Sequence, residues 1–415
     1  MSRFLIAASA LTASVLVQGA NWIPSSPLVQ IGNDCDIYFD SAASLEVTDN
    51  LYSSSTKTSA TSWMVTPGLL LEYGKDSALY ATISAKRTYV NFTDNTLSDL
   101  EDTRDALALT LRFADGGPLS LSVDSSYRVT ARNDDLQLQG LAGTLGATLA
   151  RQANYAHSFR ADYKLTEKLS IGLGFSNSYN QYLDPTVIVN TYSNYNTNTL
   201  TELNTKSIPL SFDYQAFEKL SFGLALQHDV TDYSAAPYFS TDPSTPTRPD
   251  LPNKQLVKNF ADLTAKGQLT ESGKLNSNIR VGYSQYHYDS AANDSDLSYS
   301  VSLNHLLTER LSHSLTLTRD VTASSTNSQM SAKNYTYGMA YSASEDINLN
   351  LSVTKSDVHA STSQVDSYVY NLGADYKYSK HLTFQASYSL NDSTANTAAS
   401  TFTSNAFTLS AAFRY

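Results

Sequence analysis

A set of charged residues could together line a water-filled pore, because each lies in a segment where apolar and polar residues alternate. Alternation with a period of two places successive side chains on opposite faces of a β-strand. In the segment 119–132, Leu119, Leu121 and Val123 share one face, and Asp124 and Arg128 share the other. Charges that surround a water-filled passage select ions by their sign.

These candidate pore-lining residues form a mainly basic group and an acidic group. A basic wall near an acidic wall would create a transverse electric field across a pore. The alternative interpretation is that the charges pair with one another and hold the shape of the protein. The basic group spans four consecutive predicted strands, with one later member, and the acidic group lies on the first two strands: Lys86, Arg104, Arg112, Asp124, Arg128, Arg132, Arg160 and Arg280, then Asp36, Asp40, Glu46 and Glu72.

Residues suited to catalysis or metal binding show no comparable order. A phospholipase of the outer membrane needs a Ser–His pair that faces the lipid. The histidines on the apolar faces of the alternating segments have no acidic residue at a spacing that would place it beside them: His157, His228, His305 and His313. The sequence contains no phosphate-binding glycine loop, metal-ligand cluster or nucleophile elbow. The single cysteine, Cys35, excludes an intramolecular disulfide and a thiolate pair for a metal. We therefore expect no enzymatic activity and no cofactor or metal.

A repeated segment positions the alternating faces. T-E-K-L-S-I-G-L-G-F at 166–175 recurs as F-E-K-L-S-F-G-L-A-L at 217–226 and as T-E-R-L-S-H-S-L-T-L at 308–317, with looser copies at 272–281, 344–353 and 379–388. Each copy begins with charged or turn-forming residues and continues in strict alternation. This pattern predicts a tight turn that leads into a half-buried strand.

Repetition of this hairpin predicts an all-β fold, a single closed antiparallel transmembrane β-barrel of about 18 strands (16–18). Each strand is long enough for a bilayer, which a tilted strand crosses in about 9–11 residues. We predict strands at 36–48, 63–73, 79–91, 101–113, 119–132, 154–165, 169–182, 201–214, 220–233, 260–269, 275–288, 297–306, 311–321, 334–342, 347–358, 367–378, 382–390 and 402–415.

The connections alternate between short and long, which indicates how the barrel is oriented. Short turns link each even strand to the next odd one, and longer loops link odd strands to even ones. Bacterial barrels have short periplasmic turns and long extracellular loops. The longer connections 133–150 and 235–254 are candidates for folding inward, and Tyr182, Tyr286 and Tyr288 would face the lumen near the extracellular end.

The N-terminal residues 1–20 resemble a secretory signal peptide. A positive charge at Arg3 precedes an apolar run, and small residues follow it, so we expect cleavage after Ala20. We expect a periplasmic lead-in at 21–34, the barrel at 35–415, and localisation in the bacterial outer membrane.

The last strand and the net charge indicate the partners. Phe407, Leu409, Ala411 and Phe413 alternate up to Tyr415, which resembles the C-terminal signal that the barrel assembly machinery recognises. Outer-membrane lipids would surround the barrel. The net charge of −11 makes nucleic acid an improbable partner.

Two N-terminal segments resemble the opening of the beta-barrel porin 2 family. These are D-S-A-A-S-L-E-V-T-D-N-L-Y-S-S-S at 40–55 and W-M-V-T-P-G-L-L-L-E-Y-G at 63–74, with the corner Asp49-Asn50-Leu51-Tyr52 and the Pro67-Gly68 strand. The resemblance implies an outer-membrane barrel, some relatives of which accompany exopolysaccharide production. It identifies no substrate-binding residue.

We therefore expect an outer-membrane channel that passes small hydrophilic solutes or an exopolysaccharide through a polar, charge-lined lumen. A pore for sugar export would carry inward aromatic residues, and a diffusion porin would carry a constriction. The alternative hypothesis is a plugged structural or adhesive barrel, whose loops bind partners and which conducts no ions.

Overall fold

The computed structural model describes residues 26–415 except 52, 54, 76, 115, 132–150, 184–200, 236–253, 271, 290–292, 324–328, 361–363 and 397–400. The expected signal peptide, Arg132 and most of the two longest predicted loops lie outside the described residues. In the described part of the chain, no helix is long and apolar enough to cross a membrane.

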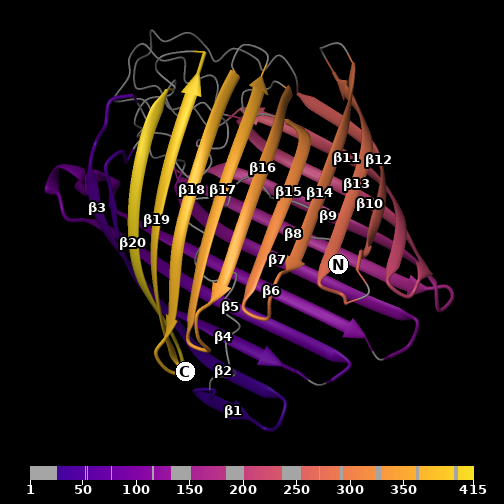
Figure 1. The fold of residues 1–415 in the computed structure, drawn as a ribbon, viewed down its shortest axis with the longest axis horizontal. Helices are drawn as coiled ribbons and strands as arrows, with labels where there is room; N and C mark the ends of the chain where they lie inside the picture. The colour runs from indigo at the N-terminus through magenta and orange to yellow at the C-terminus, as the bar shows by residue number, and fades with distance from the viewer. Residues whose placement is uncertain are drawn as a thin grey trace.

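The strands form one antiparallel sheet that closes into a barrel, as the repeated hairpins predicted (Figure 1). The first wall strand, β2 (Cys35–Thr48), pairs with the last, β20 (Phe402–Arg414), from Asp40 opposite Arg414 to Thr48 opposite Ala406. On the periplasmic side, the Phe39 N–H donates to the Tyr415 carbonyl at 2.6 Å, and the Tyr415 N–H donates back at 3.0 Å.

The second predicted strand is divided by a proline. β3 (Ala60–Thr66) and β4 (Gly68–Tyr73) both pair with β2 in one continuous register. Pro67 separates them because proline has no N–H to contribute to the ladder. A further short strand, β1 (Val29–Ile31), pairs with the start of β2, within the region expected to be a lead-in.

With β3 and β4 taken as one strand and β1 left aside, the barrel wall has 18 strands, which confirms the predicted fold class. A short 3₁₀-helix, η1 (Asn95–Leu100), lies between β5 and β6. The remaining wall strands are β5 (Leu79–Phe92), β6 (Asp102–Ala114), β7 (Leu119–Ala131), β8 (Arg151–Lys164), β9 (Leu169–Tyr182), β10 (Thr201–Phe217), β11 (Leu220–Ala235), β12 (Gln255–Gln268), β13 (Leu275–Tyr288), β14 (Asp294–Leu306), β15 (Leu311–Ala323), β16 (Gln329–Ser342), β17 (Ile347–Ala360), β18 (Gln364–Lys377) and β19 (Leu382–Ala395).

Alternation along each strand gives the barrel an apolar outer face. Leu107, Leu173 and Val281 are each more than half exposed on this face, as expected for side chains that contact lipid. Tyrosines form a band toward the extracellular end, where the Tyr127 and Tyr155 rings lie 5.0 Å apart. Such rings suit the membrane interface because they are part apolar and part polar.

The sequence repeat has a direct structural cause in the periplasmic turns. In four of the six copies, those at 166, 308, 344 and 379, the first residue is a Thr or Ser whose hydroxyl accepts hydrogen bonds from the backbone two and three residues later. The Thr166 hydroxyl accepts from the N–H groups of Lys168 (3.2 Å) and Leu169 (3.0 Å). Thr308 and Ser344 make the same pair of bonds at 3.0 to 3.2 Å. This local bonding stabilises these turns without any contact to other strands.

Asp49 links the two strands that close the barrel at the extracellular end. The Asn405 N–H donates to Asp49 Oδ1 at 2.7 Å, and the Asn405 amide donates to Oδ2 at 2.9 Å. Lys57 pairs with the same carboxylate at 2.6 Å. Partial burial alone would raise the pKa of Asp49, but the bonds from Asn405 and Lys57 outweigh it and hold this pKa below its usual range.

We predict that protonation of Asp49 weakens this closure in acid. A carboxyl whose pKa is lowered by folding stabilises the fold above its unfolded pKa of about 3.9, and this contribution is lost as the pH falls through the folded value. Urea unfolding of the wild type and of Asp49→Asn, followed from neutral to acidic pH, should give two stabilities that converge in acid. Parallel pH profiles would contradict the role of Asp49.

Candidate pore lining

The strand registers place the described candidate pore-lining residues on the face opposite the apolar belt. Asp36 lies opposite Glu72, Gly68 opposite Lys86, and Ala106 opposite Arg128. The candidates thus belong to the side that encloses the lumen. Arg132 lies outside the described residues.

Asp40 connects three parts of the barrel wall near its closure. Its Oδ2 atom lies 2.8 Å from Lys86 Nζ on β5 and 3.1 Å from Arg414 Nη2 on β20. The Lys86 side chain reaches Asp40 across β4, where the intervening residue is Gly68. A Cβ atom at Gly68 would lie 2.7 Å from both the Asp40 carbonyl and Lys86 Cγ. The glycine therefore leaves the space that this ion pair occupies.

Most of the other candidate arginines pair with a nearby carboxylate. Arg112 contacts both oxygens of Asp124 at 2.9 and 3.0 Å. Arg280 pairs at 3.2 Å with Asp262, which is almost completely buried. Such pairing favours the interpretation in which lumen charges hold the barrel's shape.

Two further arginines pair with an aspartate two residues away on the same strand face. Arg104 Nε lies 3.1 Å from Asp102, and Arg160 Nε lies 2.9 Å from Asp162 Oδ1. Asp102, Asp262 and Arg414 were not among the sequence candidates. The spacing of two residues could have revealed Asp102, because it places both side chains on one face, whereas the partners of Asp262 and Arg414 depend on the register between strands.

Arg128 differs from the other basic candidates. It is exposed on the lumen face of β7, and within the described residues no carboxylate lies within salt-bridge distance of it. On the acidic side, Asp36 accepts a hydrogen bond from the Tyr38 hydroxyl at 3.3 Å. Glu46 makes contacts of its own. Arg128 is therefore the candidate best able to act on a passing ion.

The lumen face of β16–β19 is lined mainly by neutral polar side chains. The hydroxyls of Thr336 and Thr354 are hydrogen-bonded at 3.0 Å. The Asn371 amide donates to the Ser352 hydroxyl at 3.2 Å. Hydroxyl and amide groups of this kind can exchange hydrogen bonds with water or with an uncharged hydrophilic solute. The lumen therefore has a charge-rich side, β2–β8, and a more neutral side.

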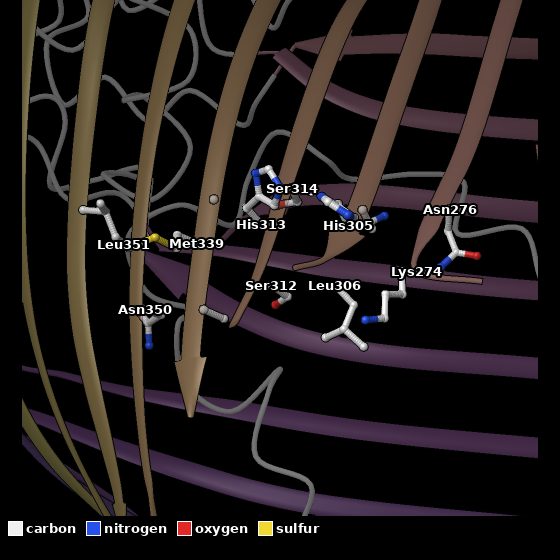
Figure 2. A pocket seen from close by; sticks show the side chains of 13 residues that line it. Lys274, Asn276, His305, Leu306, Ser312, His313, Ser314, Met339, Asn350 and Leu351 are labelled. Atoms are coloured by element: carbon white, nitrogen blue, oxygen red, sulfur yellow. Dashed lines mark hydrogen bonds between the residues drawn. The ribbon is translucent and has the colours of Figure 1, made fainter. Parts of the chain in front are cut away.

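A pocket lies along β13–β17, toward the periplasmic turns (Figure 2). Alternation places Ser312, Ser314 and Asn350 on the lumen side of the strands that form it. The histidines His305 and His313 belong to the outer side, where His305 Nδ1 and His313 Nε2 are hydrogen-bonded at 2.9 Å. Across the described part of the chain, no group of three His, Cys, Asp or Glu could hold a metal ion.

One outward pair has the residue types of a nucleophile and a base. The Ser125 hydroxyl and His157 Nδ1 are hydrogen-bonded at 2.8 Å. The two residues lie on neighbouring strands and 32 positions apart, so the sequence alone did not suggest the bond. Asn177 lies opposite His157, but its side-chain oxygen has no hydrogen-bond partner among the described residues. The third contact that would orient the base is therefore absent from this part of the chain.

Comparison with solved structures identifies the class of fold. OccAB2 from Acinetobacter baumannii is 9% identical, with 92% of this chain and 98% of that chain covered and a TM-score of 0.50. The F5-1 variant of the FrpB iron transporter from Neisseria meningitidis is 11% identical, with 86% of this chain and 63% of that chain covered and a TM-score of 0.50. The chain therefore spans less than two thirds of the transporter's length.

These similarities show that the chain has the outer-membrane β-barrel fold. No protein-family model matches the chain. No curated protein matches it either.

We predict that Gly68→Ala separates Lys86 from Asp40 and lowers stability by about 1–3 kcal/mol, as overpacking typically does. Gly338→Ala is the matched control, because its added Cβ would approach only the Ser314 hydroxyl closely, at 2.8 Å. Urea unfolding of both variants in lipid vesicles is the measurement. Equal stabilities would show that the space at Gly68 is not required.

Proposed function

We propose that this protein is an outer-membrane channel for small hydrophilic solutes. The observation that carries the proposal is the polar face that continues around the inside of a closed barrel of 18 strands. Barrels of 16–18 strands are wide enough for an aqueous channel. The charge-rich side and the neutral side both offer hydrogen bonds that can replace those of water.

An exopolysaccharide is the alternative solute. The resemblance of residues 40–55 and 63–74 to the beta-barrel porin 2 family supports this alternative, since some relatives accompany exopolysaccharide production. The same proposal includes a signal peptide cleaved after Ala20, insertion by the barrel assembly machinery through the strand that ends at Tyr415, and no catalytic activity.

A plugged barrel is the second candidate function, and one observation favours it. Tyr233, Leu256 and Tyr286 form an apolar cluster on the lumen face of β11–β13, and Tyr286 is only 1% exposed. Side chains that face an open aqueous lumen would retain more exposure. A barrel closed in this way would bind partners at its surface and would not conduct.

Single-channel recording of the refolded protein in a planar bilayer separates the two functions. We predict a steady conductance for the open channel, and its reduction by a long polysaccharide in the bath would favour the export alternative. Silence from protein whose fold is verified by its β-sheet circular dichroism would reject the channel in favour of the plugged barrel.

Arg128 allows the channel proposal to be tested by the ion selectivity of a single-residue variant. Replacing Arg128 by Glu reverses an exposed, unneutralised charge on the lumen face, so the reversal potential in a salt gradient should shift toward cation selectivity. Arg87→Gln is the control, because Arg87 pairs with Asp105 at 2.7 Å on the outer face. An unchanged reversal potential in Arg128→Glu would remove this residue from the conduction path.

A further inference from the structure

The barrel wall separates between β6 and β7 at its extracellular end. Pairing between these strands stops where Ala106 lies opposite Arg128. Residues 102–105 of β6 continue to pair with β5, and residues 129–131 of β7 continue to pair with β8. The strands thus remain regular on each side of the separation, but they no longer bond to each other.

The end of the β7–β8 hairpin (residues 129–131 and 151–153) lies on the lumen side of β6. Alternation directs Val129 and Ala153 outward, yet they are only 5% and 0% exposed. Arg151 belongs to the same outward face, and its Nε atom lies 2.8 Å from Asp102, which faces the lumen on β6. The outward-pointing Arg151 can contact the inward-pointing Asp102 when the end of β8 lies closer to the barrel axis than β6 does.

Arg151 also replaces part of the missing ladder. Its Nη2 group donates to the Thr103 carbonyl at 2.9 Å, on the section of β6 that has lost its pairing with β7. An unpaired carbonyl near a membrane is unfavourable unless another donor reaches it. The arginine therefore holds the displaced hairpin end against β6.

A second separation, between β14 and β15, has the same construction. Pairing stops where Tyr299 lies opposite Arg319, although β15 stays paired with β16 as far as Ala323. Arg319 donates to the Leu297 carbonyl at 3.0 Å and to Asp296 at 2.8 Å. Alternation directs Arg319 outward and Asp296 inward, as at the first separation.

Asp320 shows that the end of β15 leans into the lumen. Lys258 Nζ lies over the Tyr286 ring on β13, at 5.5 Å from its centroid. Asp320 Oδ1 lies 4.0 Å from the same Nζ atom. Neighbouring strands are about 4.8 Å apart, so the Asp320 carboxylate extends across β14 toward β13. This side chain is about half exposed.

We propose that the end of the β7–β8 hairpin (residues 129–131 and 151–153) and the end of β15 (residues 319–323) form the constriction of the pore, with Arg128 and Asp320 on its opposite walls. Each residue lies nine positions beyond the first residue of its strand, Leu119 or Leu311, at the periplasmic side. The two strands lie on nearly opposite sides of the ring (Figure 1). The inference rests on the proposed channel function.

The chemistry of this pair favours small zwitterionic solutes. A solute with separated positive and negative groups can turn its anionic end to Arg128 and its cationic end to Asp320. A singly charged ion is attracted to one wall and repelled by the other. Opposed charges across a narrow, partly desolvated passage act more strongly than charges in bulk water.

Cysteine labelling tests where the pore is narrowest. In a Cys35→Ser background, Arg128→Cys and Asp320→Cys are labelled with a cationic methanethiosulfonate during single-channel recording. The matched control is Asn391→Cys, nine positions beyond the start of β19, where pairing continues on both sides. We expect a larger loss of conductance at positions 128 and 320 than at 391. Equal losses at all three positions would overturn the constriction.

Vesicle swelling tests the selectivity. Glycine should enter vesicles that contain the wild-type protein faster than neutral glycerol, after correction for their diffusion rates. Removing both charges (Arg128→Gln with Asp320→Asn) should abolish this preference while ions still pass. A preference that survives in the double variant would overturn the assignment. Absence of any conductance in the folded wild type would instead reject the channel itself.

Discussion

The structure is governed by the need to complete every backbone hydrogen bond inside the lipid bilayer, where no water is available. In the hydrocarbon core of a membrane, each N–H and C=O must find a partner within the protein. A β-sheet meets this demand when its last strand pairs with its first, as β20 does with β2. Closure also forces the side chains into two classes, those that contact lipid and those that surround the lumen.

The two wall separations follow the same requirement. Where β6 leaves β7 and where β14 leaves β15, a guanidinium group donates to a carbonyl that has lost its neighbouring strand. Arginine suits this task because its planar group carries several donors and can bind a carboxylate at the same time. A local departure from the regular sheet is therefore compatible with a satisfied backbone, and it allows a strand end to move toward the lumen.

Alternation was sufficient to predict the 18 wall strands in their order and the side of the barrel that their described residues occupy, but not the break at Pro67 or the short strand β1. Leu107 and Arg112, for example, lie on the outer and lumen faces as predicted, because a period of two leaves no other choice. Cross-strand partners could not be predicted in the same way. The pairing of Asp40 with Lys86 and Arg414 depends on registers between strands that are distant in sequence, and on a glycine between them. The wall separations could not be predicted from the sequence either, because apolar and polar residues still alternate in the strands on both sides of each separation.

The Thr and Ser turns have a consequence for how such a barrel can change over evolutionary time. A turn whose hydrogen bonds are all local can form from its own residues alone. A duplicated hairpin therefore contains everything that its turn needs. Copies of this segment follow one another at a nearly constant interval in the C-terminal half of the sequence. Gain or loss of one such unit would alter the circumference of the barrel by two strands, and hence its bore, without requiring new turn chemistry elsewhere.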